Sequence, residues 1–229
     1  MRLISTANTK TMKGEEYGYL TFIQHLAPSW LSGFNTCAMA SEGCAFACLN
    51  TAGMGKFSNV QAARIAKTRW FFEDREAFMA QLVKEVAAAV RKAEKLGMTP
   101  AIRLNGTSDC RFETVEVAGK SNIMEVFPDV QFYDYTKLPN RRDIPKNYHL
   151  TFSRSESNDF LLNSAFERGM NVAVVFDKLP KTFLGRKVID GTLTDLRFLD
   201  PKGVVVGLEA KGKAKTDRSG FVVLTGDHA

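Results

Sequence analysis

Residues 19–50 read YLTFIQHLAPSWLSGFNTCAMASEGCAFACLN and join a predicted strand to three closely spaced cysteines. The strand is Tyr19–Gln24, and the cysteines are Cys37, Cys44 and Cys48, in the spacing C-x6-C-x3-C. Three thiols this close together are typical of a metal or cluster site, a redox centre or a local disulfide. On a helical turn the Cβ atoms of Cys44 and Cys48 would lie roughly 5–6 Å apart on one face. The segment therefore predicts a strand that leads into a ligand-bearing loop.

The rest of the chain alternates apolar, β-branched runs with helical patterns. Apolar residues at helical spacing predict helices over residues 59–72, 75–96, 114–127 and 157–168. Strands separated by helices indicate right-handed βαβ units and a parallel sheet. No linker divides residues 1–229, so we expect one α/β domain, a closed or partial (β/α) barrel of the TIM-barrel type. Besides residues 19–24, the predicted strands are 101–104, 130–133, 148–152, 171–176, 188–189 and 204–206.

Polar side chains follow these strands at their carboxyl ends, which meet on one face of a barrel or an open α/β sheet. Residues 105–109 (NGTSD) follow the second strand, and residues 153–156 (SRSE) follow the fourth. Such groups can hydrogen-bond the amino, carboxylate or ribose groups of a ligand, although they also form ordinary turns and helix caps. An arginine there can bind a carboxylate or phosphate, or pair with a surface carboxylate. The candidate cofactor-binding residues are Asn105, Thr107, Ser108, Asp109, Arg154 and Glu156.

Composition limits the cellular setting. The chain has 229 residues and 45% hydrophobic content, which is enough for a full core. It has no apolar run of 18 residues and no apolar stretch near the N-terminus that resembles a signal peptide. We therefore expect a cytoplasmic protein that does not bind membranes, in which thiols serve as ligands rather than as disulfides. The net charge of +6 is compatible with nucleic acid or phosphorylated partners without requiring them.

The cysteines allow three interpretations. Three thiolates at residues 37–48 can hold a [4Fe–4S] cluster and leave one iron open to a small molecule. Alternatively, Cys110 supplies a fourth thiolate and closes a tetrahedral zinc site. The cysteines could also be small apolar residues of a core. We favour the cluster with Cys110 as a bystander, because the three clustered thiols already form a self-sufficient ligand set.

Two other features have weaker implications. His25 lies near the cysteine loop, but a single histidine beside a strand is more typical of a core residue than of a ligand. The segment 211–220, KGKAKTDRSG, is basic and could contact phosphates. It has no interleaved aromatic residues on which bases could stack.

Several stretches together resemble a phage-borne family known as gene-product-88-like proteins. The resemblance implies a bacteriophage origin and a setting in the host cytosol. It covers most of the chain and rests on NTCAMASEGCAFACLNTAGMG, IRLNGTSD, FYDYTK, YHLTFSRSE and VIDGTLTDLRFLDPKGVVVGLEAKGKAKTDRSGFV.

The plan is also similar to that of radical S-adenosylmethionine enzymes. In that family a three-cysteine loop follows the first strand of a partial β/α barrel and holds a [4Fe–4S] cluster, whose open iron binds S-adenosylmethionine. The usual cysteine spacing there is C-x3-C-x2-C, and the second strand ends in Gly-Gly-Glu. This chain has C-x6-C-x3-C and NGTSD instead.

Two hypotheses of function follow from the sequence. In the first, the protein is a cluster-dependent enzyme that acts on a small molecule at the mouth of the barrel. In the second, it is a non-enzymatic protein, stabilised by zinc or a cluster, that binds nucleic acid or a host factor.

Overall fold

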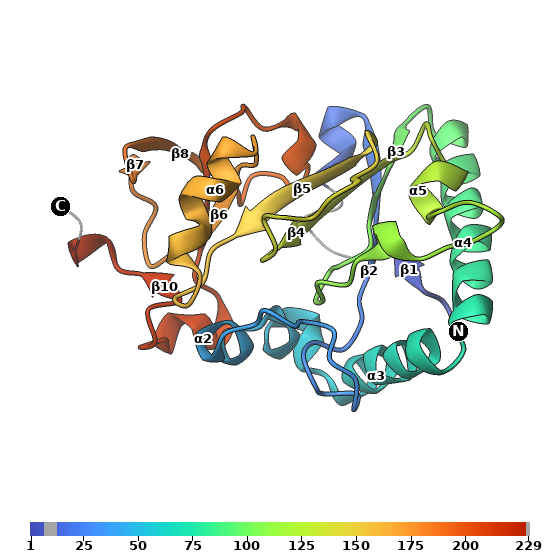
Figure 1. Ribbon diagram of the computed structural model, residues 1–229, viewed down its shortest axis with the longest axis horizontal. Coiled ribbons are helices and arrows are strands. Elements are labelled where there is room, and N and C mark those ends of the chain that lie inside the picture. Colours follow the sequence, from blue (N-terminus) through green and yellow to red (C-terminus); the bar gives the residue numbers. More distant parts are fainter. Residues whose placement is uncertain (7–12, 228–229) are drawn as a thin grey trace.

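The predicted strands form one sheet in the computed structural model, which describes residues 1–6 and 13–227 (Figure 1). The strand order is β1-β2-β3-β4-β5-β6-β9-β8-β7, and β10 pairs with β6 off this path. Every pair is parallel except β1 with β2 and β7 with β8. The strands are β1 Ile4–Ser5, β2 Tyr19–Gln24, β3 Thr99–Arg103, β4 Gln131–Thr136, β5 Tyr148–Ser153, β6 Val172–Phe176, β7 Thr182–Phe183, β8 Arg186–Asp190, β9 Val205–Glu209 and β10 Val222–Val223.

The predicted α/β class is confirmed, but a closed barrel is not formed. Strands β2 to β6 follow one another in chain order, as they would in a barrel. Beyond β6 the order of the strands in the sheet is reversed relative to the chain. Strand β9 pairs with β6, and the β7–β8 hairpin forms the edge. Short antiparallel strands thus occupy both edges of the sheet, and within the described residues these edges do not pair with each other. An edge covered in this way cannot accept the strand that would close a barrel.

The longest helix follows the predicted periodicity. Helix α4 buries Phe78, Leu82, Val86 and Ala89 along one face, at the spacing of an amphipathic helix. Asp74 caps its first turn by accepting a hydrogen bond from Ala77 N at 3.1 Å. The α-helices are α2 Glu42–Phe46, α3 Ser58–Glu73, α4 Arg75–Lys95, α5 Ile123–Val126 and α6 Leu162–Glu167, and the 3-10 helices are η1 Glu15–Tyr17, η2 Leu49–Thr51, η3 Gly53–Lys56, η4 Phe112–Thr114, η5 Asp159–Leu161, η6 Arg197–Leu199, η7 Gly212–Thr216 and η8 Thr225–Asp227.

The two faces of the sheet differ in chemistry because side chains alternate along each strand. On one face Ile102 and Phe132 join α4 and α5 in the largest apolar cluster. On the other face their neighbours Ala101 and Tyr133 pack against Leu196, in the segment that contains η6. In Figure 1, α4 stands at one end of the sheet, while α2 and α3 lie beneath it.

Two local predictions are wrong. The helix predicted over residues 114–127 is only the short α5, because Ala118 and Gly119 have positive φ and close a turn between Val117 and Lys120. Cys44 and Cys48 do not share one helical face, because α2 ends at Phe46. The helix predicted over residues 157–168 is present in shortened form, as η5 followed by α6.

None of the helices among the described residues combines the length and the apolar character needed to cross a bilayer.

Candidate metal centre

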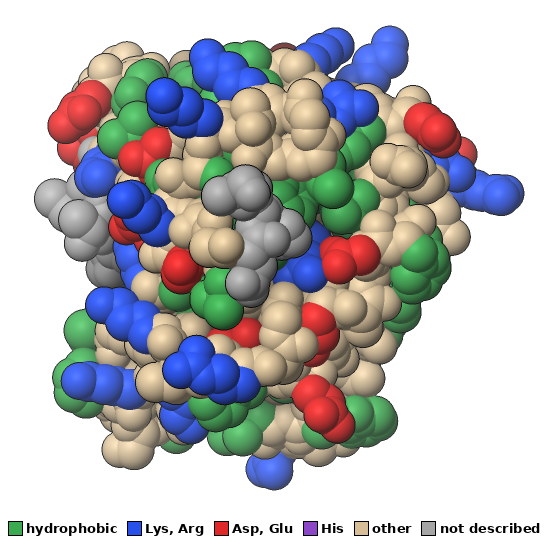
Figure 2. All heavy atoms as spheres, turned by 90° about the vertical axis from the view of Figure 1, so that its left-hand side faces the viewer, with side chains coloured by type: hydrophobic (Ala, Val, Ile, Leu, Met, Phe, Trp, Pro, Cys, Tyr) green, Lys and Arg blue, Asp and Glu red, His purple; other side chains and the backbone are tan. Residues whose placement is uncertain are grey.

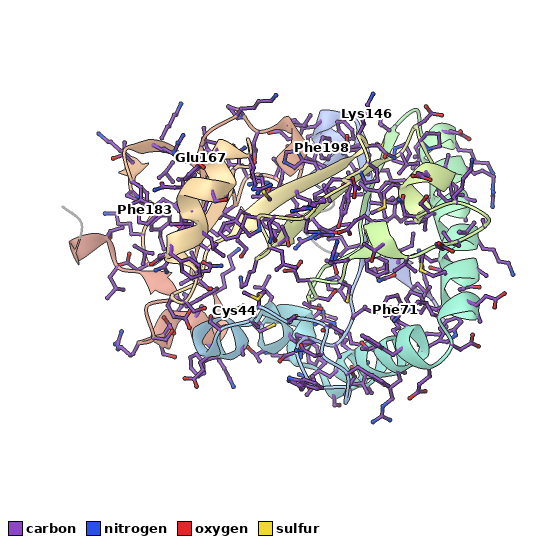
Figure 3. All side chains as sticks on the ribbon, viewed as in Figure 1. Cys44, Phe71, Lys146, Glu167, Phe183 and Phe198 are labelled. Carbon is purple, nitrogen blue, oxygen red and sulfur yellow. The ribbon has the colours of Figure 1, made fainter. Side chains whose placement is uncertain are left out.

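The cysteine loop lies at the carboxyl ends of the parallel strands. Asp109 N, beyond the end of β3, donates a hydrogen bond to Thr36 O at 2.8 Å. Cys37 Sγ donates to Thr107 O at 3.7 Å in the same turn. Figure 3 shows Cys44 on α2, beneath the sheet. The loop that follows β2 is therefore held against the loop that follows β3.

Glu156, beyond the end of β5, fixes the start of α2. Its carboxylate accepts hydrogen bonds from Ser41 Oγ at 2.7 Å and from Gly43 N at 2.8 Å. Ser41 is also the N-cap, and its hydroxyl accepts a hydrogen bond from Cys44 N at 3.2 Å. A carboxylate at the positive end of a helix is electrostatically favourable. Residues from two distant segments thus set the position of Cys44.

Gly43 has a packing role rather than a conformational one. Gly43 lies inside α2 without a positive φ. A Cβ there would lie 2.1 Å from Ser219 Oγ and 2.7 Å from Phe221 Cβ. Only glycine allows α2 to approach the C-terminal segment this closely.

All four cysteines are free thiols, and all are partly buried. Burial raises the pKa of Cys48 to about 11 and that of Cys110 to about 12, and it also raises the pKa of Cys37. Neighbouring thiols add to each increase: Cys44 and Cys37 act on Cys48, and Cys37 acts on Cys110. The thiols of Cys37, Cys48 and Cys110 are therefore neutral at pH 7, and a metal would displace their protons when it binds.

The thiols are gathered but are not arranged around one point. Within the described ranges, no group of three or more His, Cys, Asp or Glu side chains is placed to hold a metal ion. Thiolates are suitable ligands for a cluster or zinc, but the side chains are not placed to bind either one in this conformation. Binding would require the thiols, which lie on loops and within the short helix α2, to rotate toward one another.

Cys110 lies closer to the other thiols than its place in the sequence suggested. Its sulfur donates to Thr36 O at 3.8 Å, and Thr36 is the residue before Cys37. Its thiol is thus within reach of the same loop. This position keeps open its role as a fourth ligand.

The NGTSD turn is shaped by its own hydrogen bonds. Asn105 is buried, and its side chain donates to Asp134 Oδ2 at 3.1 Å and to Cys110 O at 3.0 Å. Asn105 Oδ1 accepts from Ser108 Oγ at 2.8 Å, and Thr107 Oγ1 donates to Leu26 O at 2.6 Å. These four side chains build the turn that supports Cys37 and Cys110.

Two further candidate residues make ion pairs within the protein. Arg154 donates to both carboxylate oxygens of Asp159, at 2.6 and 2.8 Å, and also to the backbone oxygens of Gly220 and Phe221. Through these contacts Arg154 links the end of β5 to the segment before β10. Asp109 accepts a hydrogen bond from Lys137 N at 2.8 Å, and it lies 3.5 Å from the Arg141 guanidinium.

Sequence reasoning missed a polar network on the face of the sheet opposite α4. Arg103 Nη1 donates to Asp195 Oδ2 at 3.0 Å, and the Tyr133 hydroxyl donates to the same oxygen at 3.3 Å. The Arg103 guanidinium also lies 4.7 Å from the centre of the Tyr135 ring. The strand period could have predicted this network. Arg103 is two residues from Ala101, and Tyr135 is two residues from Tyr133, so each pair lies on one face of the sheet.

His25 lies at the end of β2 among cations. Burial first, and then the charges of Arg64, Arg103 and Lys67, lower its pKa to about 3, while Asp195 opposes them. A Cβ on Gly106 would lie 2.7 Å from His25 Cδ2, so the NGTSD turn packs directly on the imidazole. His25 is thus a neutral, packed residue beside the cysteine loop.

The neutral state of His25 predicts a pH dependence of stability. The unfolded chain takes up a proton at His25 near pH 6.5, whereas the folded chain does not do so until about pH 3. Between pH 6.5 and 4.5 this difference removes about 2 kcal/mol from the free energy of unfolding. We expect His25→Gln to remove this part of the loss, as measured by urea unfolding at several pH values. His149 stays in both proteins, so parallel curves for the two proteins would contradict the prediction.

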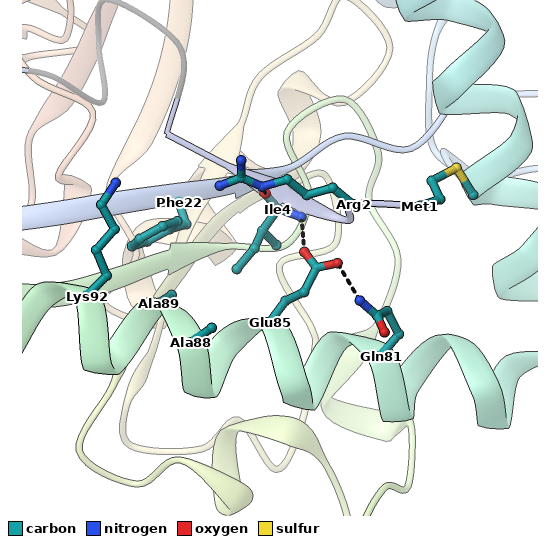
Figure 4. Close-up of a pocket in the computed structure, with 9 residues that line it drawn as sticks. All are labelled: Met1, Arg2, Ile4, Phe22, Gln81, Glu85, Ala88, Ala89 and Lys92. Atoms are coloured by element: carbon teal, nitrogen blue, oxygen red, sulfur yellow. Dashed lines mark hydrogen bonds between the residues drawn. The ribbon is translucent and has the colours of Figure 1, made fainter.

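The groove drawn in Figure 4 lies between β1 and α4, away from the cysteines. Glu85 on α4 accepts hydrogen bonds from Leu3 N and Ile4 N, each at 2.9 Å, and from Gln81 Nε2 at 2.9 Å. These bonds hold the first strand on the helix. They account for the carboxylate of Glu85 and the amide of Gln81 in the groove without a ligand.

The model of a family described as "Gene product 88" matches residues 2–224. No match was found among curated proteins or among solved structures. The comparisons therefore give no support to the similarity with radical S-adenosylmethionine enzymes.

Proposed function

The chain belongs to the gene product 88 family, and we propose that this member binds a [4Fe–4S] cluster through Cys37, Cys44 and Cys48. The observation that carries the proposal is the placement of four free, partly buried thiols in two neighbouring segments at the carboxyl ends of the parallel strands. A phage origin and the reducing host cytosol belong to the same proposal, because they would keep these thiols free.

Two hydrogen bonds beside Cys48 would stabilise an anionic [4Fe–4S] cluster. Asn50 N donates a hydrogen bond to Cys48 Sγ at 3.5 Å, and the buried Arg64 donates to Asn50 Oδ1 at 2.5 Å. Hydrogen bonds to ligand sulfurs and nearby positive charge stabilise the added electron of a reduced cluster. Arg64 would therefore hold Asn50 in place and supply a counter-charge.

Three cysteines leave one iron of a [4Fe–4S] cluster without a protein ligand, and that iron supplies a site for a small molecule or for electron transfer. The neighbouring turn offers an acceptor for such a molecule. The hydroxyl of Ser108 keeps free lone pairs after donating to Asn105, whereas Asp109 Oδ1 is buried and lies 3.5 Å from the Arg141 guanidinium. We propose a cluster-dependent enzyme, of radical S-adenosylmethionine or redox type, that binds its ligand here. S-adenosylmethionine, with its amino and carboxylate groups, is the first ligand to test.

A second candidate is a zinc-stabilised binding protein without catalytic activity. The contact of Cys110 with Thr36 favours it, because Cys110 would then complete a four-thiolate zinc site. The ion pair between Arg154 and Asp159 favours it too, because a guanidinium paired within the protein is not available to bind a substrate.

Metal analysis separates the two candidates. We expect the full chain, purified without oxygen, to be brown and to contain about four irons and four labile sulfides, the content of one cubane cluster. The measurements are iron, sulfide and zinc contents per chain, with the visible absorption spectrum. One zinc per chain without labile sulfide would contradict the cluster and support the second candidate.

A further inference from the structure

Aromatic and basic side chains meet on the outer surface of the cysteine segment. The exposed surface comprises α2, η2, η3 and η7, and η2 contacts both η3 and η7. A Cβ on Gly212 of η7 would lie 3.0 Å from Ala52 Cβ, which shows how closely these segments pack. We call this area the basic aromatic surface; it consists of Phe46, Leu49, Met54, Lys56, Phe57, Lys211, Lys213 and Lys215.

The cations of this surface lie beside its aromatic rings. Lys213 Nζ lies 5.8 Å from the centre of the Phe46 ring, and Lys56 Nζ lies 5.7 Å from that of Phe57. Both rings are 46% exposed, although aromatic side chains are normally buried. The sequence of residues 211–220 contains no aromatic residue, and the fold supplies Phe46 from a segment about 170 residues away.

The charge of the surface is complementary to an anion. Four lysines belong to it, and the exposed acids on its elements or next to them are Glu42 and Glu209. Figure 2 views the molecule from the left of Figure 1 and shows Lys and Arg side chains spread over this face, with apolar and acidic side chains among them. An apolar partner alone would not require this charge.

We propose that the basic aromatic surface binds single-stranded nucleic acid. Unpaired bases would stack on Phe46 and Phe57, and their phosphates would contact Lys56 and Lys213. A duplex is disfavoured, because its bases are already stacked and the surface has no long helix to enter a groove. The proposal does not depend on the [4Fe–4S] cluster. The side chains of the basic aromatic surface point to solvent, whereas Cys44 packs inward against the apolar side chains of Ala210, Ala214 and Phe221.

The test is fluorescence anisotropy with the full chain and fluorescein-labelled (dT)20, U20 and a 20-base-pair duplex. We expect the single strands to bind more tightly than the duplex. Phe46→Ala and Phe57→Ala should each weaken binding about 5- to 100-fold, the effect of one lost stacking contact. Lys213→Gln should reduce the slope of log affinity against log salt by about 0.7, the effect of one lost phosphate contact.

Matched controls come from elsewhere on the surface. Phe160 is 78% exposed in η5, and Lys95 is exposed at the end of α4. Phe160→Ala and Lys95→Gln should leave binding unchanged, and all five substituted positions are exposed, so the fold should be retained. The proposal would be overturned by equal effects of the controls, by tighter binding of the duplex, or by binding to vesicles of anionic lipid in place of the oligonucleotides.

Discussion

We expect alanine at Cys37, Cys44 or Cys48 to reduce bound iron from about four atoms per chain to background. Each residue would supply a thiolate to the same cluster, and a cluster held by three cysteines cannot spare one of them. The three side chains are only partly buried, so the apoprotein should remain folded. The measurements are iron and sulfide content after anaerobic purification, with circular dichroism to confirm the fold.

The Cys110→Ala variant is the control for this series. We expect it to keep most of its iron, because three thiolates already suffice for the proposed cluster. Its sulfur contacts the backbone beside Cys37, so the outcome is informative in either direction. If Cys110→Ala loses metal as completely as the other variants, four thiolates hold the metal, and the open iron on which the enzyme proposal rests is ruled out.

The largest effect on stability should come from the buried ion pair between Glu113 and Arg141. Their side chains are 1% and 2% exposed, and Arg141 Nε donates to Glu113 Oε1 at 2.9 Å as part of a two-point contact. Glu113→Ala would leave a buried guanidinium with Asp109 as its remaining carboxylate partner, 3.5 Å away. Removing one partner of such a pair costs about 3–5 kcal/mol. We expect a loss of that size in urea unfolding.

The neighbouring Glu116 provides a matched control. It is exposed, so Glu116→Ala should change the free energy of unfolding by about 0.5 kcal/mol or less. Equal effects of the two substitutions would show that the Glu113–Arg141 pair is not a principal support of the fold.

Because Asp109 contacts both Arg141 and the cysteine loop, we also expect Glu113→Ala to weaken metal binding.

The sequence alone determined the main strands and the longest helix. Six apolar residues at helical spacing predicted α4, and five of the seven predicted strands overlap the observed ones by at least three residues. The short predictions at 188–189 and 204–206 share two residues each with β8 and β9. Alternation of strands and helices also indicated that the strands would be parallel, which places their carboxyl ends together. These features depend on local backbone preference and on which face is apolar, and both can be read from neighbouring residues.

Only the tertiary structure decided how far the sheet closes and which polar side chains are already occupied. The β7–β8 hairpin ends the sheet, and the two-residue strands β1, β7 and β10 are too short to produce a pattern in the sequence. Arg154 was a candidate ligand until the fold brought Asp159 and Gly220 to its guanidinium. Lys213 and Phe46 likewise became neighbours only through folding. Local patterns fix burial and backbone geometry, but the partner of a charge or a ring depends on contacts between distant segments, which no short stretch of sequence encodes.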